Sequence, residues 1–282
     1  MSRTARATLA VLLPMAVAPA GTAAQTVAEV VERMYASAER QAEGIDDYTI
    51  IQSALGIETT SHFVKEVVDG RPLFRLSDSD ATGLSFSLGD ENAGVGDIFL
   101  YGPDLIEHGR YAGREEIGGS AVHVIAVDDL SLLDLAQPSA PGDVEFEPRS
   151  ARLYIDDRMM IARRMEFTGD AITPGGSQEI TVSVDMQSFL PVESLFVPYR
   201  TVVRIDGLEE VIGPETMAQL QEMERQLAAL PPAEREMMER MLGPQLDVLR
   251  QMTAGGDGGM TVEVTVADVL INTAAAGGGV PR

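Results

Sequence analysis

The three histidines of the chain are the first residues to consider for chemistry, because histidine ligates metals and transfers protons near neutral pH. His62, His108 and His123 are scattered, and none has a second histidine at the i+2 or i+4 spacing of a metal-binding face. The neighbours of His123 are apolar, so we expect it to be a hydrogen-bonded histidine in a core or edge strand. The sequence therefore predicts no metal site and no cofactor.

The usual nucleophiles and acid pairs of enzymes are also missing from the sequence. The 282 residues include no cysteine, which excludes thiolate nucleophiles, disulfides and cysteine-ligated metals. Neither a Gly-x-Ser-x-Gly elbow nor a phosphate-binding glycine loop occurs. Acidic residues are adjacent at 46–47, 128–129 and 156–157, whereas a glycosidase needs two carboxylates facing each other across a cleft. We therefore expect the protein not to be an enzyme.

The charge of the chain excludes another class of function. Asp and Glu number 44 against 21 Lys and Arg, which gives a formal net charge of -23 at pH 7. Such a field repels phosphate backbones, so we expect no nucleic-acid partner. Much of the acidity falls between Asp78 and Glu147, which we interpret as a solvated face. Hydrophobic residues make up 45% of the chain, which is enough to bury a core.

The first 24 residues are typical of a secretory signal peptide. Arg3 and Arg6 precede an apolar run over residues 7–18, and small residues then lead to Ala24. The run is shorter than the roughly 20 residues that span a bilayer, and no later segment is long and apolar enough to do so. We expect cleavage after Ala24, a periplasmic location and no transmembrane segment in the mature chain.

The spacing of apolar residues predicts one helix followed by a sheet. Residues 26–41 have the helical periodicity of an amphipathic helix. Strict alternation over 178–187 and 261–267 indicates an antiparallel sheet with one packed face. Further strands are expected at 48–57, 61–68, 73–77, 84–88, 98–101, 122–127, 152–155, 160–168 and 192–205, the last broken by Pro198. We predict an α+β fold, with a large curved antiparallel sheet or partly open β-barrel covered by the N-terminal helix and by an inserted helical hairpin.

The hairpin is predicted at residues 214–252. Two apolar stripes at helical spacing are separated by Pro231 and Pro232, and six of the fourteen methionines lie in this segment. Methionine is flexible and polarizable, which suits changeable apolar partners such as acyl chains. The sequence leaves three roles open for this hairpin: a lid, a part of the core, or a docking surface for a partner. We expect a single domain over residues 25–273 and a flexible tail at 274–282.

The order of motifs along the chain resembles the LolA-like outer-membrane lipoprotein-sorting family. Residues 63–75 are similar to the second-strand region of the family, where an Arg-Pro pair, here Arg71 and Pro72, precedes an apolar residue and an aromatic. Residues 151–156 followed by 161–167 look like its paired strands, and 189–198 resembles its approach to a strand that ends in proline. The resemblance covers most of residues 26–273.

This resemblance implies an apolar cavity for acyl chains, and transport instead of catalysis. It also implies that Arg71 bonds to the lid and holds the cavity closed, as a guanidinium with five donors can do. The alternative for Arg71 is a surface position in the turn after Gly70. The candidate lining residues are Phe63, Phe74, Leu76, Phe86, Met217, Leu220, Met223, Met238 and Met241.

Two functions follow from the resemblance. The first is a monomeric periplasmic carrier of lipid or lipoprotein acyl chains that exchanges cargo with a membrane-bound donor or acceptor protein. The second is an envelope interaction or stress-sensing module of the MucB-like kind, which binds a protein partner through the methionine-rich hairpin. The chain has no tryptophan, and its hairpin is longer than the lid helices expected of the family's standard carriers, so both functions stay open.

Overall fold

The computed structural model describes residues 25–54, 56–68, 70–79, 101–133, 145–173, 176–207, 225 and 259–273. The predicted signal peptide, the predicted strand at 84–88, the predicted tail and, apart from Arg225, the predicted hairpin lie outside these residues. None of the helices described is long and apolar enough to cross a membrane.

The fold begins with α1 (Val27–Gln41), at the position predicted from the helical periodicity. Thr26 caps this helix, because its side-chain oxygen accepts a hydrogen bond from the backbone N–H of Glu29 at 3.2 Å. The carboxylate of Glu29 accepts in return from the backbone N–H of Thr26 at 3.0 Å, which completes a capping box. The buried face of the helix consists of Val27, Val30, Val31, Met34, Tyr35 and Ser37.

The structure describes ten strands, all in one antiparallel sheet. The elements after α1 are β1 (Asp47–Ala54), β2 (Ile57–Val68), β3 (Arg71–Ser79), α2 (Gly102–His108), β4 (Arg110–Ile117), β5 (Ser120–Val127), the short 3₁₀ helix η2 (Leu130–Leu132), β6 (Glu145–Asp156), β7 (Ala162–Thr173), β8 (Gly176–Val192), β9 (Leu195–Asp206) and β10 (Met260–Ile271). Their order across the sheet is β3-β2-β1-β10-β9-β8-β7-β6-β5-β4, so β3 and β4 are the edge strands.

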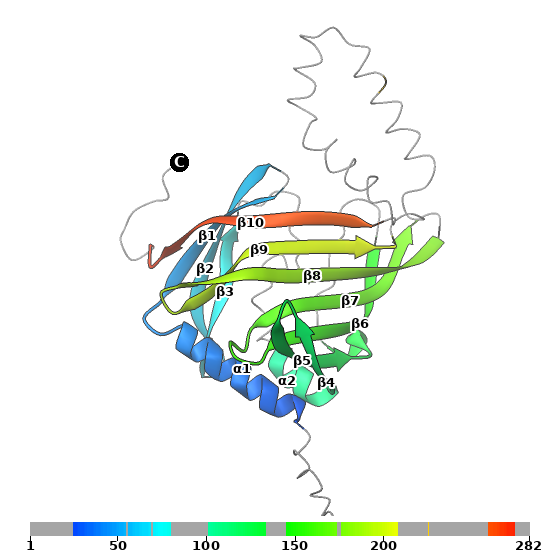
Figure 1. Ribbon diagram of the computed structural model, residues 1–282, viewed down its shortest axis with the longest axis horizontal. Helices are drawn as coiled ribbons and strands as arrows, with labels where there is room; N and C mark the ends of the chain where they lie inside the picture. Colours follow the sequence, from blue (N-terminus) through cyan, green and yellow to red (C-terminus); the bar gives the residue numbers. More distant parts are fainter. Residues whose placement is uncertain are drawn as a thin grey trace, which may run out of the picture.

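The sheet is strongly curved. Strands β1 to β3 run steeply relative to β7 to β10, and α1 and α2 lie together at one end (Figure 1). Because β3 and β4 do not pair with each other, the sheet is an open barrel. The predicted α+β class, with an open antiparallel sheet and an N-terminal helix packed on it, is confirmed.

Two local predictions were wrong, and one strand was not predicted. Pro198 does not break β9: it pairs with Phe189 on β8, in a stretch of β9 that β10 does not reach, where a missing N–H is tolerated. Tyr101 does not end a strand, because Gly102 and Pro103 begin α2 directly after it. The edge strand β4 was not predicted, because charged residues mask its alternation of apolar and polar positions.

The described residues form three hydrophobic clusters, and the two larger ones, here called the two cores, differ in how fully they are buried. Under α1 and across β5 to β9, a large cluster of buried side chains includes Val30, Ile125 and Ile155, each fully inaccessible. The second core contains only Ile45, Leu195 and Val197 as buried members among the described residues. Half-buried apolar side chains surround it: Tyr48, Ile50, Phe74, Val192, Tyr199, Val266, Val269 and Ile271. The half of the sheet around β1 and β10 thus keeps apolar surface partly open.

Candidate functional site

Tyr48 is the centre of an aromatic strip on this less buried half of the sheet. Its ring stacks on Phe63 with centroids 4.7 Å apart and planes inclined by 13°, and it meets Phe74 edge-on at 4.9 Å. The strand register places Tyr48 opposite Phe63, and Phe63 opposite Leu76. Opposed residues of antiparallel strands share a face of the sheet. The aromatic strip is therefore Tyr48, Phe63, Phe74 and Leu76, drawn from β1, β2 and β3.

The strip brings together three of the residues predicted to line a cavity, namely Phe63, Phe74 and Leu76. Their role as cavity lining stays a prediction. The remaining candidates lie outside the described residues: Phe86, Met217, Leu220, Met223, Met238 and Met241. Sequence reasoning did not include Tyr48, because the alternation of β1 identifies its face but not the strand that pairs beside it.

Arg71 joins the edge strand β3 to α1. Its Nη2 donates to both carboxylate oxygens of Glu32, at 3.1 and 3.2 Å. Its guanidinium carbon also lies 3.9 Å from the centroid of the Tyr35 ring, within the range of a cation–π contact. Nη1 is buried and has no hydrogen-bond partner among the described residues. The helix that Arg71 reaches is α1, and its predicted contact with a lid stays a prediction.

Arg33, the neighbour of Glu32 on α1, reaches the opposite half of the sheet. Its Nη2 donates to the backbone oxygen of Asp157 at 2.8 Å and approaches Oδ1 of the same residue at 3.3 Å. Asp157 lies in the turn between β6 and β7. We call the pairs Glu32–Arg71 and Arg33–Asp157 the helix clasp, because together they hold α1 across the open sheet.

His123 on β5 completes the Asp157 end of the clasp. The ring is fully buried, with Nε2 at 2.7 Å from Oδ1 of Asp157 and Nδ1 at 3.1 Å from the hydroxyl of Tyr111. A neutral imidazole fits both contacts, since Nε2–H donates to the carboxylate while Nδ1 accepts from the phenol. Arg114 on the edge strand β4 donates to the same Oδ1 at 3.2 Å. The expected hydrogen-bonded core position of His123 is confirmed.

Burial and the charges around His123 together set the protonation state of its ring. Burial lowers the pKa of His123 below its ordinary value, and the guanidiniums of Arg114 and Arg33 act in the same direction, while Asp157 opposes them. Burial would raise the pKa of Asp157, but the hydrogen bond from His123 and the nearby Arg114 and Arg33 prevail and lower it. Neutral histidine beside an ionised aspartate is therefore the stable state near pH 7.

This cluster is suited to holding elements together. A general base must reach a substrate proton, whereas the His123 ring is inaccessible and both of its nitrogens already have partners. Within the described ranges, no group of three or more His, Cys, Asp or Glu side chains could hold a metal ion. We therefore assign Tyr111, His123 and Asp157 to the attachment of α1.

Among known proteins, similarity to this chain was found in solved structures. No protein-family model and no curated protein matches the chain. Among solved structures, it is similar to an outer membrane lipoprotein-sorting protein domain from Vibrio parahaemolyticus, with 11% identity over 87% of this chain and 92% of that chain and a TM-score of 0.35. It is also similar to LolA superfamily protein NE2245 from Nitrosomonas europaea, with 10% identity over 89% of this chain and 94% of that chain and a TM-score of 0.32.

A third similar structure is a DUF1329 family protein from Desulfovibrio piger, with 8% identity over 86% of this chain and 93% of that chain and a TM-score of 0.34. Two of the three names belong to the family that the sequence motifs resemble. All three TM-scores lie below 0.5.

Proposed function

We propose that the protein is an exported, LolA-like binding protein that holds acyl chains of a lipid or lipoprotein on the aromatic strip, between the sheet and its helical cover. The observation that supports this is the difference in burial between the two cores. The core beneath α1 is closed, whereas the second core leaves apolar side chains of β1, β3, β9 and β10 half-buried. Half-buried apolar surface on the packed side of a sheet is where an apolar ligand gains most.

The energetics suit an acyl chain. Each methylene removed from water contributes about 0.8 kcal/mol, so a chain with about ten of them on the strip gains roughly 8 kcal/mol before the entropic cost of ordering it. Such binding needs few polar contacts, which agrees with a site built mainly from Tyr48, Phe63 and Phe74. No chemical step is part of this function, so the protein acts as a carrier, not as an enzyme.

The helix clasp attaches α1 to β3, the strand that contributes Phe74 and Leu76 to the proposed binding face. Glu32 and Arg71 have side chains 59% and 32% exposed, and pairs with this much solvent contact contribute only about 0–1 kcal/mol. This ion pair alone is therefore a weak attachment of α1 to β3, whereas Arg33 on the other side of the helix is attached to Asp157, which contacts the buried His123. A monomeric periplasmic carrier of this kind would receive and deliver cargo through membrane-bound donor or acceptor proteins.

The direct test is to identify the cargo. The full chain is expressed for export, purified from the periplasm without detergent, and its organic extract is analysed by mass spectrometry beside a control protein of similar charge. We expect a stoichiometric lipid or acylated peptide. A clean extract, together with no displacement of a bound fluorescent fatty acid, would overturn the proposal.

A matched pair of variants locates the cargo on the strip. Phe63→Gln removes an aromatic of the strip, whereas Val67→Gln changes a residue on the same strand that is 72% exposed. We expect Phe63→Gln to weaken binding of the fluorescent fatty acid at least tenfold and Val67→Gln to leave it within twofold. Circular dichroism melting shows whether both variants stay folded. If the two variants weakened fatty-acid binding equally, the aromatic strip would not be the binding site.

The interaction module is tested by deleting residues 214–252. If the hairpin docks on a partner protein, the shortened chain keeps its sheet and its lipid but no longer captures that partner. If the hairpin is a lid or part of the core, the deletion releases lipid or lowers the melting temperature.

A further inference from the structure

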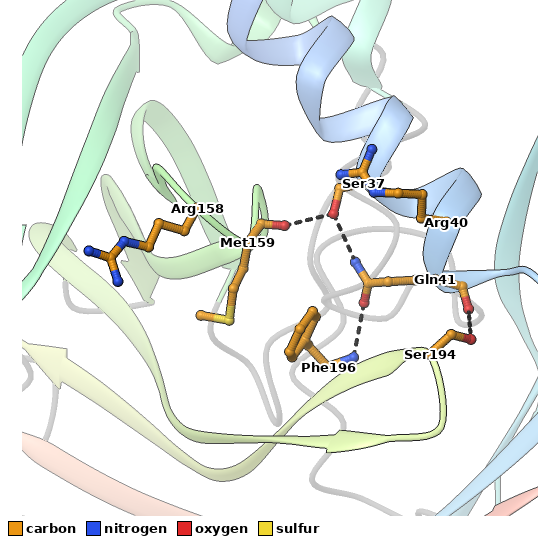
Figure 2. A pocket seen from close by; sticks show the side chains of 7 residues that line it. All are labelled: Ser37, Arg40, Gln41, Arg158, Met159, Ser194 and Phe196. Atoms are coloured by element: carbon orange, nitrogen blue, oxygen red, sulfur yellow. Dashed lines mark hydrogen bonds between the residues drawn. The ribbon is translucent and has the colours of Figure 1, made fainter.

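A cleft of about 360 Å³ lies outside the aromatic strip, between the C-terminal half of α1 and two turns of the sheet (Figure 2). The turn between β6 and β7 contributes Arg158 and Met159, and the chain at the start of β9 contributes Ser194 and Phe196. The volume is at the lower end of small-ligand pockets, which run from roughly 300 to 1,000 Å³. The cleft therefore suits a small group or one end of a larger ligand.

One wall of the cleft is held in shape by its own hydrogen bonds (Figure 2). Ser37 Oγ donates to the backbone oxygen of Met159 at 2.7 Å, and Gln41 Nε2 donates to Ser37 Oγ at 3.3 Å. Gln41 Oε1 accepts from the backbone N–H of Phe196 at 3.0 Å, and Ser194 Oγ donates to the backbone oxygen of Gln41 at 2.8 Å. These bonds tie α1 to both turns, so the wall is formed before any ligand arrives.

The turn between β6 and β7 is fixed as well. Oδ1 of Asp156 accepts from the backbone N–H groups of Arg158 and Met159 at 2.9 and 2.8 Å. The neighbouring charge of Asp157 is already neutralised by Arg33 and Arg114. Neither aspartate is therefore left to pair with the guanidinium of Arg158.

Within the part of the chain that the structure describes, Arg40 and Arg158 are two arginines without an ionic partner. Among the described residues they are the two arginines whose guanidiniums make no hydrogen bond or ion pair, and both line this cleft. Acidic residues outnumber basic ones by 44 to 21 in this chain, so two free guanidiniums at one cleft indicate an anionic ligand. Each offers up to five donors in a planar fork that matches carboxylate and phosphate oxygens.

Part of the space between the two arginines is apolar, beside the polar side chains of Ser37 and Gln41. In Figure 2 the side chains of Met159 and Phe196 lie between those of Arg158 and Arg40. Phe196 is 38% exposed, a large apolar side chain left open to solvent. A ligand that satisfies both features carries an anionic group joined directly to an apolar segment.

We propose that this cleft binds the anionic headgroup of a single-chain amphiphile, a carboxylate or a phosphate monoester, with the first methylenes of its tail on Met159 and Phe196. Leu195 and Val197, on either side of Phe196, point to the opposite face of β9 and are buried in the second core. The cleft and the second core thus lie on opposite faces of β9. The inference rests on the proposed function for the class of ligand, an amphiphile with an acyl tail, whereas anion recognition rests on the two arginines alone.

The experiment measures binding of dodecanoate, dodecyl phosphate, the neutral ester monododecanoylglycerol and inorganic phosphate to the full chain by isothermal titration calorimetry. The test variant is Arg40→Gln with Arg158→Gln. The control is Arg75→Gln with Arg110→Gln, which changes the net charge equally but removes arginines paired to Glu66 and Asp128, away from the cleft. All four substituted arginines are exposed. We therefore expect the melting temperatures of both variants to lie close to that of the wild type.

We expect the test variant to weaken dodecanoate and dodecyl phosphate at least tenfold, and the neutral ester less than twofold, while the control changes neither. Equal weakening in both variants, or no preference of the wild type for anionic over neutral amphiphiles, overturns the anion site and leaves the carrier function standing. Inorganic phosphate that binds as tightly as dodecyl phosphate overturns the amphiphile assignment in favour of free phosphate. Failure of all amphiphiles to bind overturns the proposed function together with this inference.

Discussion

Single side chains in this protein differ widely in how much they contribute to stability, and Asp157 has several partners at once. Its Oδ1 contacts Arg33, Arg114 and His123, from α1, β4 and β5. Asp128 also pairs with an arginine, Arg110, but that pair is exposed on both sides. Substitution of Asp157 should therefore lower the stability of the protein much more than substitution of Asp128.

We predict that Asp157→Asn destabilises the protein by about 2 kcal/mol, because two arginines lose their counter-charge next to a buried imidazole. Urea unfolding followed by circular dichroism measures the change in the free energy of unfolding. Asp128→Asn is the control, and no measurable change is expected there. If the two variants unfolded at the same urea concentration, the attachment role of Asp157 would be wrong.

At the scale of elements, α1 is attached to the sheet on two sides of its middle turn, through the adjacent residues Glu32 and Arg33. The attachment to β3 depends on Arg71, with its contacts to Glu32 and Tyr35. Arg75, four residues later on the same strand, pairs with Glu66 on β2 and has no hydrogen bond or ion pair to α1 among the described residues. Substitution of Arg71 therefore tests the attachment of α1, whereas substitution of Arg75 tests only the pairing of β3 with β2.

Arg71→Gln is expected to loosen α1 without unfolding the sheet. Loss of the ion pair and of the stacking on Tyr35 should cost about 1–2 kcal/mol locally. Amide hydrogen exchange should therefore accelerate in α1 and β3, while β7, β8 and β9 keep their protection. Arg75→Gln should leave exchange in α1 unchanged; faster exchange of α1 in that variant as well would argue against the clasp.

How far the sequence predicts these elements depends on the distance over which each signal acts. The helical period over residues 26–41 and the alternation in β8 and β10 are local signals, and all three elements lie where they were predicted. The pairing of β1 with β10 joins residues more than 200 positions apart, and alternation alone does not choose a partner strand. The clasp and the arginine cleft depend on such tertiary neighbours, so Arg33, Arg40 and Arg158 carried no local signal.

For the whole molecule, the large negative charge and the buried histidine respond to pH in different ranges. Carboxylates titrate mainly near pH 4, so the net charge changes little between pH 7.5 and 5.5. The pKa of His123 in the folded protein is lowered by burial and by Arg114 and Arg33. The unfolded chain therefore takes up a proton at a higher pH than the folded chain does.

The sign of the pH effect follows from this difference. Since the unfolded state binds more protons below about pH 6.5, the free energy of unfolding falls as the pH is lowered through that value, with a slope of at most about 1.4 kcal/mol per pH unit for one group. We predict this loss for the wild type between pH 7.5 and 5.5 and a smaller slope for His123→Gln, measured by urea unfolding at several pH values. Because only slopes are compared, an overall loss of stability in the variant does not affect the result. Parallel curves for the two proteins would show that His123 is not the group that couples the attachment of α1 to pH.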